Sequence, residues 1–322
     1  MANKTIPQLP EQTGKTDDDL LVIVDSGETT TSKIKISTLL SGVGGSSPFI
    51  AADGTNNAVP DYYATSSIDS LSSESAIIGG TGNVMIGTHN ESVIIGGNTN
   101  GFVNSSTNST LIGGTTNIIS TGTNNSIMGG NNNTIQNVND SSIVGGWSNN
   151  ISMSSSFISG QANIITGGAR TCSGIVGSKN GNISGNFGFI GGGQNHIITE
   201  SEGGILGGLA CDVRGRWSVV AACDNSNVYG TFSLIGAGAA HNCTGSQSAI
   251  IGGQSNNNSH NFSVILGGNS QTTLQQNEVV VPKLRTTQYA SLNFSGDTAA
   301  AAAGVQLGEF YHDNGVVRVR IT

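Results

Sequence analysis

Charged and aromatic residues are scarce in this chain, at 10% and 5% of its 322 residues. The net charge is −8, yet the stretch 92–139 contains no charged residue at all. Nucleic-acid binding needs a footprint of lysine and arginine, and attachment to an anionic membrane surface needs a basic face. The composition therefore argues against both nucleic acid and membrane as partners.

Long apolar runs and paired cysteines are also lacking. No run approaches the 18 residues of a membrane span, and the first residues, MANKTIP, include no apolar segment typical of a secretion signal. We therefore expect a soluble chain that is made in a cytoplasm. The cysteines have none of the close pairs that zinc sites use, so we expect no metal and no cofactor. They are interpreted as small buried apolar residues: Cys172, Cys211, Cys223 and Cys243.

What the chain has in abundance is glycine, 48 residues in all, much of it in a repeated phrase. The phrase is a serine, two or three apolar residues, Gly-Gly, two polar residues, asparagine, any residue and an apolar residue. The apolar residue before the glycine pair recurs with a mean spacing of about 15.7 residues, and a fixed period of this kind indicates a stacked architecture. We place it at positions 78, 95, 112, 128, 144, 158, 176, 190, 206, 220, 235, 251 and 266.

The residue types predict strands rather than helices. Short β-branched runs are bounded by glycine and asparagine, which favour tight turns, and no apolar spacing has the helical period. About 16 residues accommodate two strands of roughly five residues and two turns. We therefore predict an all-β fold, a narrow parallel β-solenoid of about 13 rungs. A hydrogen-bonded asparagine ladder is expected along the stack, formed by Asn83, Asn100, Asn117, Asn133, Asn149, Asn163 and Asn195.

Two adjacent positions before each glycine pair are apolar, although neighbouring residues in a strand point to opposite faces. One of them can fill the interior of the coil, and the other then needs a second apolar surface. A narrow coil also buries little surface on its own. We therefore expect an obligate homotrimer, with the choice of core and axial column left open among Ile77, Ile78, Ile94, Ile95, Leu111, Ile112, Ile250, Ile251, Ile265 and Leu266.

The composition divides the chain into four parts. Residues 1–45 predict a small β-hairpin module, residues 46–73 a linker and residues 74–276 the solenoid. Residues 277–322 break the period and include Asn314-Gly315, the strongest short signal for a hairpin turn. We expect this last part to be a capping and trimerisation module, because an open solenoid end invites further strand addition.

The repeats resemble the head repeats of trimeric autotransporter adhesins, which are left-handed parallel β-rolls packed as trimers. Here bulkier Ile, Val and Leu replace alanine, and the spacing varies from 14 to 18 residues. The order of elements in residues 1–45 resembles the attachment segment of bacteriophage tail and fibre proteins, and the C-terminal segment resembles a terminal module of phage structural proteins. These resemblances imply a homotrimeric tail or head fibre of a virion. It would be anchored to other virion proteins by its N-terminus and would contact the host surface, including its polysaccharides.

The repeats predict no catalytic site. Glycosidases need paired carboxylates, and the six acids between residues 75 and 274 share no repeating face. A polysaccharide-degrading tailspike enzyme and a bacterial trimeric surface adhesin stay open as alternatives, the latter without a recognisable secretion signal or membrane anchor. Candidate residues for surface contact are the long aromatic and basic ones, which can stack on sugars and donate hydrogen bonds: Trp147, Arg214, Arg216 and Trp217.

Overall fold

The computed structural model describes residues 66–68, 72–167, 172–283 and 289–321, together with the backbone of four earlier strands. These strands are β1 (Leu20–Val24), β2 (Thr31–Lys35), β3 (Phe49–Ala51) and β4 (Ala58–Pro60). β1 pairs antiparallel with β2, and β3 with β4. The rest of the predicted attachment module and most of the predicted linker lie outside the described residues.

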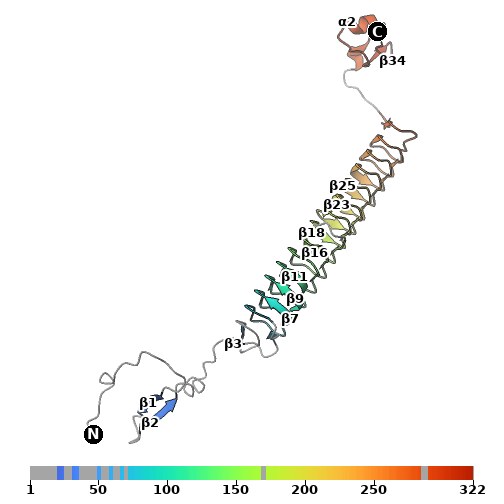
Figure 1. The fold of residues 1–322 in the computed structure, drawn as a ribbon. Coiled ribbons are helices and arrows are strands. Elements are labelled where there is room, and N and C mark those ends of the chain that lie inside the picture. The colour runs from blue at the N-terminus through green and yellow to red at the C-terminus, as the bar shows by residue number, and fades with distance from the viewer. Residues whose placement is uncertain are drawn as a thin grey trace.

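From residue 66 to residue 283 the described chain winds into a parallel β-solenoid of about 14 turns (Figure 1). Two parallel sheets run along it, each built of one short strand per turn. The first sheet begins where β4 pairs with β6. It contains β6 (Ala76–Ile78), β8 (Val93–Ile95), β10 (Thr110–Ile112), β12 (Ser126–Met128), β14 (Ser142–Val144), β16 (Phe157–Gln161), β18 (Gly174–Lys179), β20 (Phe189–Ile190), β21 (Gly193–Gln194), β23 (Gly204–Leu209), β25 (Val219–Asp224), β27 (Leu234–Ala239), β29 (Ala249–Ile251), β31 (Val264–Leu266) and β32 (Val279–Val280).

The second sheet has 13 strands in sequential order. Figure 1 shows its strands β7, β9 and β11 stacked beside those of the first sheet. Its strands are β5 (Ser67–Ile68), β7 (Val84–Asn90), β9 (Gly101–Thr107), β11 (Ile118–Thr123), β13 (Thr134–Gln136), β15 (Asn150–Ile151), β17 (Ile164–Ile165), β19 (Asn182–Ile183), β22 (Ile197–Ile198), β24 (Asp212–Val213), β26 (Asn227–Val228), β28 (Asn242–Cys243) and β30 (Asn257–Asn258).

The predicted parallel β-solenoid is confirmed, while the strand lengths and the register differ from the expectation. Many strands have only two or three residues, because each rung bends at three corners. Two of these corners contain a residue in the left-handed conformation, such as Thr116 (φ 55°) and Asn124 (φ 57°). Ile158 pairs with Ile143 and not with Val144. Of the predicted positions for the apolar residue before the glycine pair, 158, 190, 220 and 235 were therefore one residue early. Equivalent residues of successive rungs are 15 to 17 positions apart.

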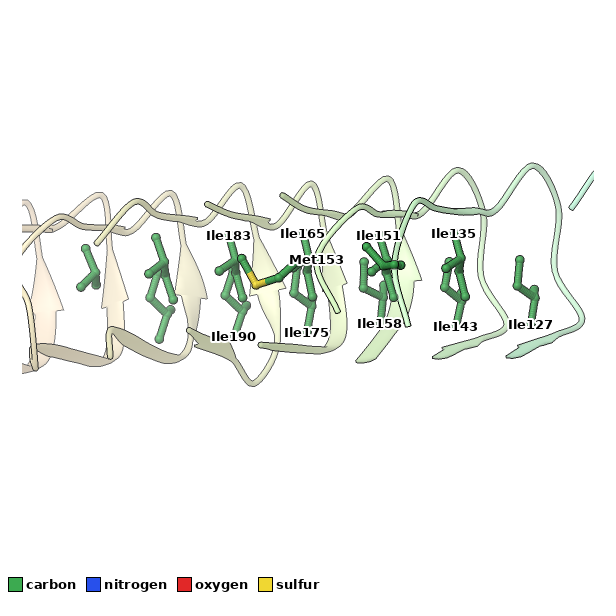
Figure 2. Close-up of a cluster of buried hydrophobic side chains, with 14 of the residues drawn as sticks. Ile127, Ile135, Ile143, Ile151, Met153, Ile158, Ile165, Ile175, Ile183 and Ile190 are labelled. Atoms are coloured by element: carbon green, nitrogen blue, oxygen red, sulfur yellow. The ribbon is translucent and has the colours of Figure 1, made fainter. Parts of the chain in front are cut away.

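The core of the solenoid is a double column of aliphatic side chains, one from each sheet. Figure 2 shows pairs such as Ile151 with Ile158 and Ile183 with Ile190 pointing into the space between the sheets. Each buried side chain of this size contributes about 1.5–3 kcal/mol. The first sheet contributes Ile77, Ile94, Leu111, Ile127, Ile143, Ile158, Ile175, Ile190, Ile205, Val220, Ile235, Ile250 and Ile265, and the second Ile68, Met85, Phe102, Ile119, Ile135, Ile151, Ile165, Ile183, Ile198, Val213, Val228 and Cys243.

Buried asparagines satisfy the backbone at the corner that follows each glycine pair. The Oδ1 atom of Asn117 accepts the backbone N–H of Asn133 at 3.0 Å, and the Oδ1 atom of Asn133 accepts that of Asn149 at 3.0 Å. The Nδ2 group of Asn133 donates to the Gly146 carbonyl oxygen at 3.2 Å. The ladder therefore joins side chain to backbone from rung to rung. Asn83, Asn100, Asn117, Asn133, Asn149 and Asn163 make such bonds.

Asn195 is not part of this ladder, contrary to the prediction. It is exposed in a left-handed conformation (φ 60°), and the buried ladder position is taken by its neighbour His196. The prediction placed the ladder residue four positions after the first glycine, here Gly191. Because three glycines precede this corner, the ladder position lies one residue later, at His196. Close packing requires the second glycine of each pair, since a Cβ atom on Gly97 would overlap the Asn100 amide and the Gly114 carbonyl oxygen. The first glycine, such as Gly96, has open space around it and is favoured by its positive φ of 67°.

Histidine replaces asparagine in the ladder at two rungs. The Nδ1 atom of His241 accepts the backbone N–H of Asn256 at 3.2 Å, and its Nε2 atom donates to the Ala237 carbonyl oxygen at 3.2 Å. The Nδ1 atom of His196 accepts the N–H of Cys211 at 3.2 Å. At His241 the two imidazole nitrogens thus take the roles of Oδ1 and Nδ2, and at His196 the Nδ1 atom takes the role of Oδ1. Burial lowers the pKa of both histidines below 6.5.

A second buried polar column lies at the corner that precedes the first sheet. The Oγ atom of Ser218 accepts the backbone N–H of Ser233 at 3.0 Å and donates to the Gly230 carbonyl oxygen at 2.7 Å. Ser233 repeats the pattern with Ser248 and Gly245. Serine fits here because its hydroxyl is both donor and acceptor. Two of the three corners are therefore held by buried side chains.

Residues 289–321 form a small unit with its own core. It contains a 3₁₀ helix, η2 (Tyr289–Leu292), an α-helix, α2 (Asp297–Ala302), and a hairpin of β33 (Phe310–Asp313) and β34 (Val316–Val319). The Asp297 carboxylate accepts hydrogen bonds from the Tyr311 hydroxyl at 2.6 Å and from the Ile321 N–H at 2.8 Å. None of the described helices is long and apolar enough to cross a membrane.

Replacing Asn133 by alanine should destabilise the solenoid by about 1–3 kcal/mol, because the buried N–H of Asn149 loses its acceptor. The measurement is denaturant unfolding followed by circular dichroism at fixed protein concentration. Asn131→Ala is the matched control, since Asn131 is exposed two residues earlier in the same rung. Equal free energies of unfolding for the two variants would contradict the stabilising role assigned to the asparagine ladder.

The stability contributed by His241 should depend on pH. Its folded-state pKa is lowered, so its contribution is complete above pH 6.5 and is lost as the pH falls from 6.5 through the lowered pKa. His241→Asn keeps both hydrogen bonds and removes the titration. The free energy of unfolding of the variant, measured by denaturant unfolding at each pH, should therefore fall less between pH 7 and pH 5 than that of the parent.

The control for this comparison is His260→Asn, which removes a histidine that lies outside the ladder. Its pH profile should follow that of the parent protein. A His241→Asn profile parallel to the parent profile would show that the ladder tolerates an imidazolium ion.

Candidate interaction surfaces

The outward side of the first sheet, which we name the apolar face, carries two columns of residues. The leading column precedes each buried residue in the strand, and the trailing column follows it. The leading column is Ala76, Val93, Thr110, Ser126, Ser142, Phe157, Gly174, Phe189, Gly204, Val219, Leu234, Ala249, Val264 and Val279. The trailing column is Ile78, Ile95, Ile112, Met128, Val144, Ser159, Val176, Gly191, Leu206, Ala221, Gly236, Ile251, Leu266 and Val281.

No position of the apolar face holds a charged or amide side chain. Large side chains are nevertheless open to solvent in the single chain, with Ile78 44% exposed and Leu206 58% exposed. The outward side of the second sheet is mixed: Asn182 and Asp212 are polar, whereas Ile86 and Ile164 are 54% and 40% exposed. What sets the apolar face apart is that it stays free of charged and amide side chains through every described rung.

The structure separates the two apolar residues that precede each glycine pair. The first of each pair is buried in the core and the second lies on the trailing column. Ile77, Ile94, Leu111, Ile250 and Ile265 are fully buried, and Ile78, Ile95, Ile112, Ile251 and Leu266 are 40–50% exposed.

A second candidate surface is the corner that precedes the serine column. In the 15-residue rungs the equivalent positions all have φ between 53° and 59°, and they are occupied by Phe187, Glu202, Trp217, Phe232, Gln247 and Phe262. We name these six residues the aromatic ridge. Its phenylalanines are 46–54% exposed and Trp217 is 42% exposed.

The centre of the aromatic ridge is a stack that runs along the rod. The rings of Trp217 and Phe232 are nearly parallel, with centroids 4.6 Å apart and an interplanar angle of 13°. The Arg216 guanidinium lies 3.8 Å from the centroid of the Trp217 ring and pairs with the Glu202 carboxylate at 2.9 Å. Phe232 of the following rung covers one face of the Trp217 ring, and Arg216 covers the other. Glu202 of the preceding rung pairs with Arg216.

Arginine 214 makes a parallel set of contacts beside the ridge. Its guanidinium pairs with the Asp212 carboxylate at 2.8 Å and lies 5.4 Å from the centroid of the Tyr229 ring. Hydrogen bonds with their carboxylate partners raise the pKa of both arginines, Arg214 and Arg216. The structure thus places Arg216 against Trp217, whereas Arg214 contacts Asp212 and Tyr229 instead.

Trp147 does not join this group. It forms a bridge between Asn131 and Gln161 directly after a glycine pair, which is a different corner of the coil, and it is 52% exposed. Sequence reasoning missed Phe187, Phe232 and Phe262. The signal was present, since these residues and Trp217 are spaced by 15 or 30 positions.

The described residues include no group of three or more His, Cys, Asp and Glu placed to hold a metal ion. Cys211, Cys223 and Cys243 are buried as predicted, whereas Cys172 is exposed, and none of the four forms a disulfide. Burial raises the pKa of the Cys223 thiol to about 11 and that of Cys243 to about 12. Thiols with such pKa values carry almost no thiolate at neutral pH, so they are poor nucleophiles.

The small C-terminal unit has an apolar surface of its own. Every residue of β34 is exposed, including Val316 at 57% and Val317 at 61%. Phe310 is 61% exposed on the paired strand, and Ile321 is 77% exposed. A unit of this size rarely folds on a single core unless something else supports it.

No protein-family model and no curated protein sequence matches this chain. Conclusions about function therefore depend on the surfaces described above.

Replacing Trp217 by alanine should destabilise the protein by about 1 kcal/mol, because the stacking contact with Phe232 is lost. Trp147→Ala should change the stability by no more than about 0.5 kcal/mol, the usual range for an isolated surface side chain. Denaturant unfolding curves measured side by side test the comparison. A larger loss for Trp147→Ala would indicate a packing role for Trp147 that the described contacts do not show.

Proposed function

We propose that this protein is a structural fibre in which three copies of the chain pack their apolar faces around a common axis. The observation that supports this proposal is the apolar face itself, an uncharged strip that continues through all the described rungs of the first sheet. At about 4.8 Å per rung its length is about 60 Å. A strip of this length exceeds the apolar patches that monomeric proteins leave in water.

The number of copies follows from the narrowness of the coil. Each copy offers one continuous apolar face, and its other sides carry polar side chains interrupted by apolar ones such as Ile86 and Phe262. Three coils around an axis cover three such faces at once and leave the more polar sides outward. The exposed valines of β34 and the exposed Phe310 support the same assembly, because their burial between copies would complete a core too small for one chain.

The setting we propose is a virion. The resemblance of residues 1–45 to phage attachment segments supports anchoring to other structural proteins of a tail or head, and the more polar outer sides of the rod suit contact with a host surface. A uniform stack of rungs holds its two ends at a fixed distance from each other, and this role needs no catalytic centre. The described carboxylates of Glu202 and Asp212 are each paired with an arginine, an arrangement that supports a structural role over a glycosidase.

Light scattering tests the assembly directly. The native mass should be about 98 kDa, three times the chain mass of 32.6 kDa. Leu206→Lys should reduce it to the mass of one chain or shift the dissociation to lower denaturant, because a trimer would bury the added ammonium group without a partner.

Thr199→Lys is the matched control, since it adds the same charge to an exposed position directly after β22 of the second sheet. It should leave the mass at the trimer value. A parent protein with the mass of a single chain would overturn the proposed function, and equal behaviour of the two lysine variants would show that the apolar face is not the interface.

A further inference from the structure

The two columns of the apolar face are complementary in size, rung by rung. From β12 to β29, nine consecutive rungs each pair one larger residue with one Gly, Ala or Ser. The pairs, leading residue first, are Ser126 and Met128, Ser142 and Val144, Phe157 and Ser159, Gly174 and Val176, Phe189 and Gly191, Gly204 and Leu206, Val219 and Ala221, Leu234 and Gly236, and Ala249 and Ile251.

The larger residue does not stay in one column. It is leading at Phe157 and Phe189, and trailing at Val176 and Leu206 in the rungs next to them. A composition bias within one column cannot produce this alternation. The alternation therefore distinguishes one height of the rod from the next.

The chain itself does not require the missing side chains at three of the four glycines. A Cβ atom on Gly174, Gly204 or Gly236 would find its nearest neighbour at 3.6, 3.5 and 3.8 Å, which is ordinary contact, and none of the three has a positive φ. Gly191 differs, because a Cβ atom there would lie 2.8 Å from the Leu206 carbonyl oxygen. Packing within the single chain therefore does not require glycine at Gly174, Gly204 or Gly236.

Cyclic symmetry supplies a use for small residues at these positions. Around a threefold axis each copy meets the next through two different edges of the same surface. If the copies are parallel, the leading column of one lies against the trailing column of the next. At equal height, Leu234 then meets Gly236 of the neighbouring copy, and Gly204 meets Leu206.

We propose that the three copies pack in parallel and in exact rung register, with the larger residue of each rung filling the space over the small residue of the neighbouring copy. The inference rests on the proposed trimer and adds its direction and register. A shift by one rung would oppose Phe189 to Val176 or Leu206, and would leave Gly204 facing Gly191 or Ala221. Overpacking and cavities would then occur together, and both are costly.

Engineered disulfides test the register in the full-length chain. The background is Cys172→Ser, which removes the exposed cysteine. The in-register pair is Leu234→Cys with Gly236→Cys, placed at one height. Within one strand these two positions are about 6.6 Å apart with parallel side chains, which opposes a disulfide inside the chain. The off-register pair is Leu234→Cys with Leu206→Cys, which are two rungs apart.

After mild oxidation, most of the in-register variant should migrate as a covalent trimer on a non-reducing denaturing gel. The off-register variant and each single variant should give little or no covalent trimer. Native mass is measured on every sample beforehand. A native trimer in which the off-register pair crosslinks as well as the in-register pair, or in which the in-register pair stays uncrosslinked, would overturn the register. A native monomer would overturn the proposed function itself.

Discussion

The structure depends on satisfying backbone hydrogen bonds at the corners of a very narrow coil. Strands of two or three residues pair with the rungs above and below, but the corner residues cannot complete that pattern alone. Asn133 shows the solution, since its side chain accepts the N–H of Asn149 in the next rung and donates to the Gly146 carbonyl oxygen of that next rung. Because an unsatisfied buried N–H costs about 1–3 kcal/mol, the corners would open without these side chains.

This requirement explains which substitutions the repeat tolerates. His241 replaces asparagine because its two ring nitrogens present an acceptor and a donor in corresponding places. At Gly181 no side chain is present, and its backbone N–H ends the run by donating to Asn163 at 2.7 Å. The core columns accept Ile, Val, Leu, Met, Phe and Cys more freely, since dispersion and burial are not directional.

The same regularity turns single residues into continuous surfaces. One apolar residue per rung becomes a strip along the rod, and an aromatic residue at a corner becomes part of a ridge. In the ridge, stacking between rungs covers the faces of Trp217 and leaves its edges exposed. The stack therefore favours a stabilising role over the sugar-stacking role that the sequence suggested for this tryptophan.

The repeat period, the alternation of apolar residues and the glycine pairs were enough to predict a parallel β-solenoid, because each is a local consequence of strand and turn geometry. The register was harder, since the rungs vary between 15 and 17 residues and an extra glycine displaced Asn195 from its expected place. Only the tertiary structure decided that Ile77 is buried and Ile78 exposed, and that Trp217 stacks on Phe232 while Trp147 lies on another corner. These outcomes depend on which residues of successive rungs share a height. Pairing between rungs sets that height, and no single repeat contains the information.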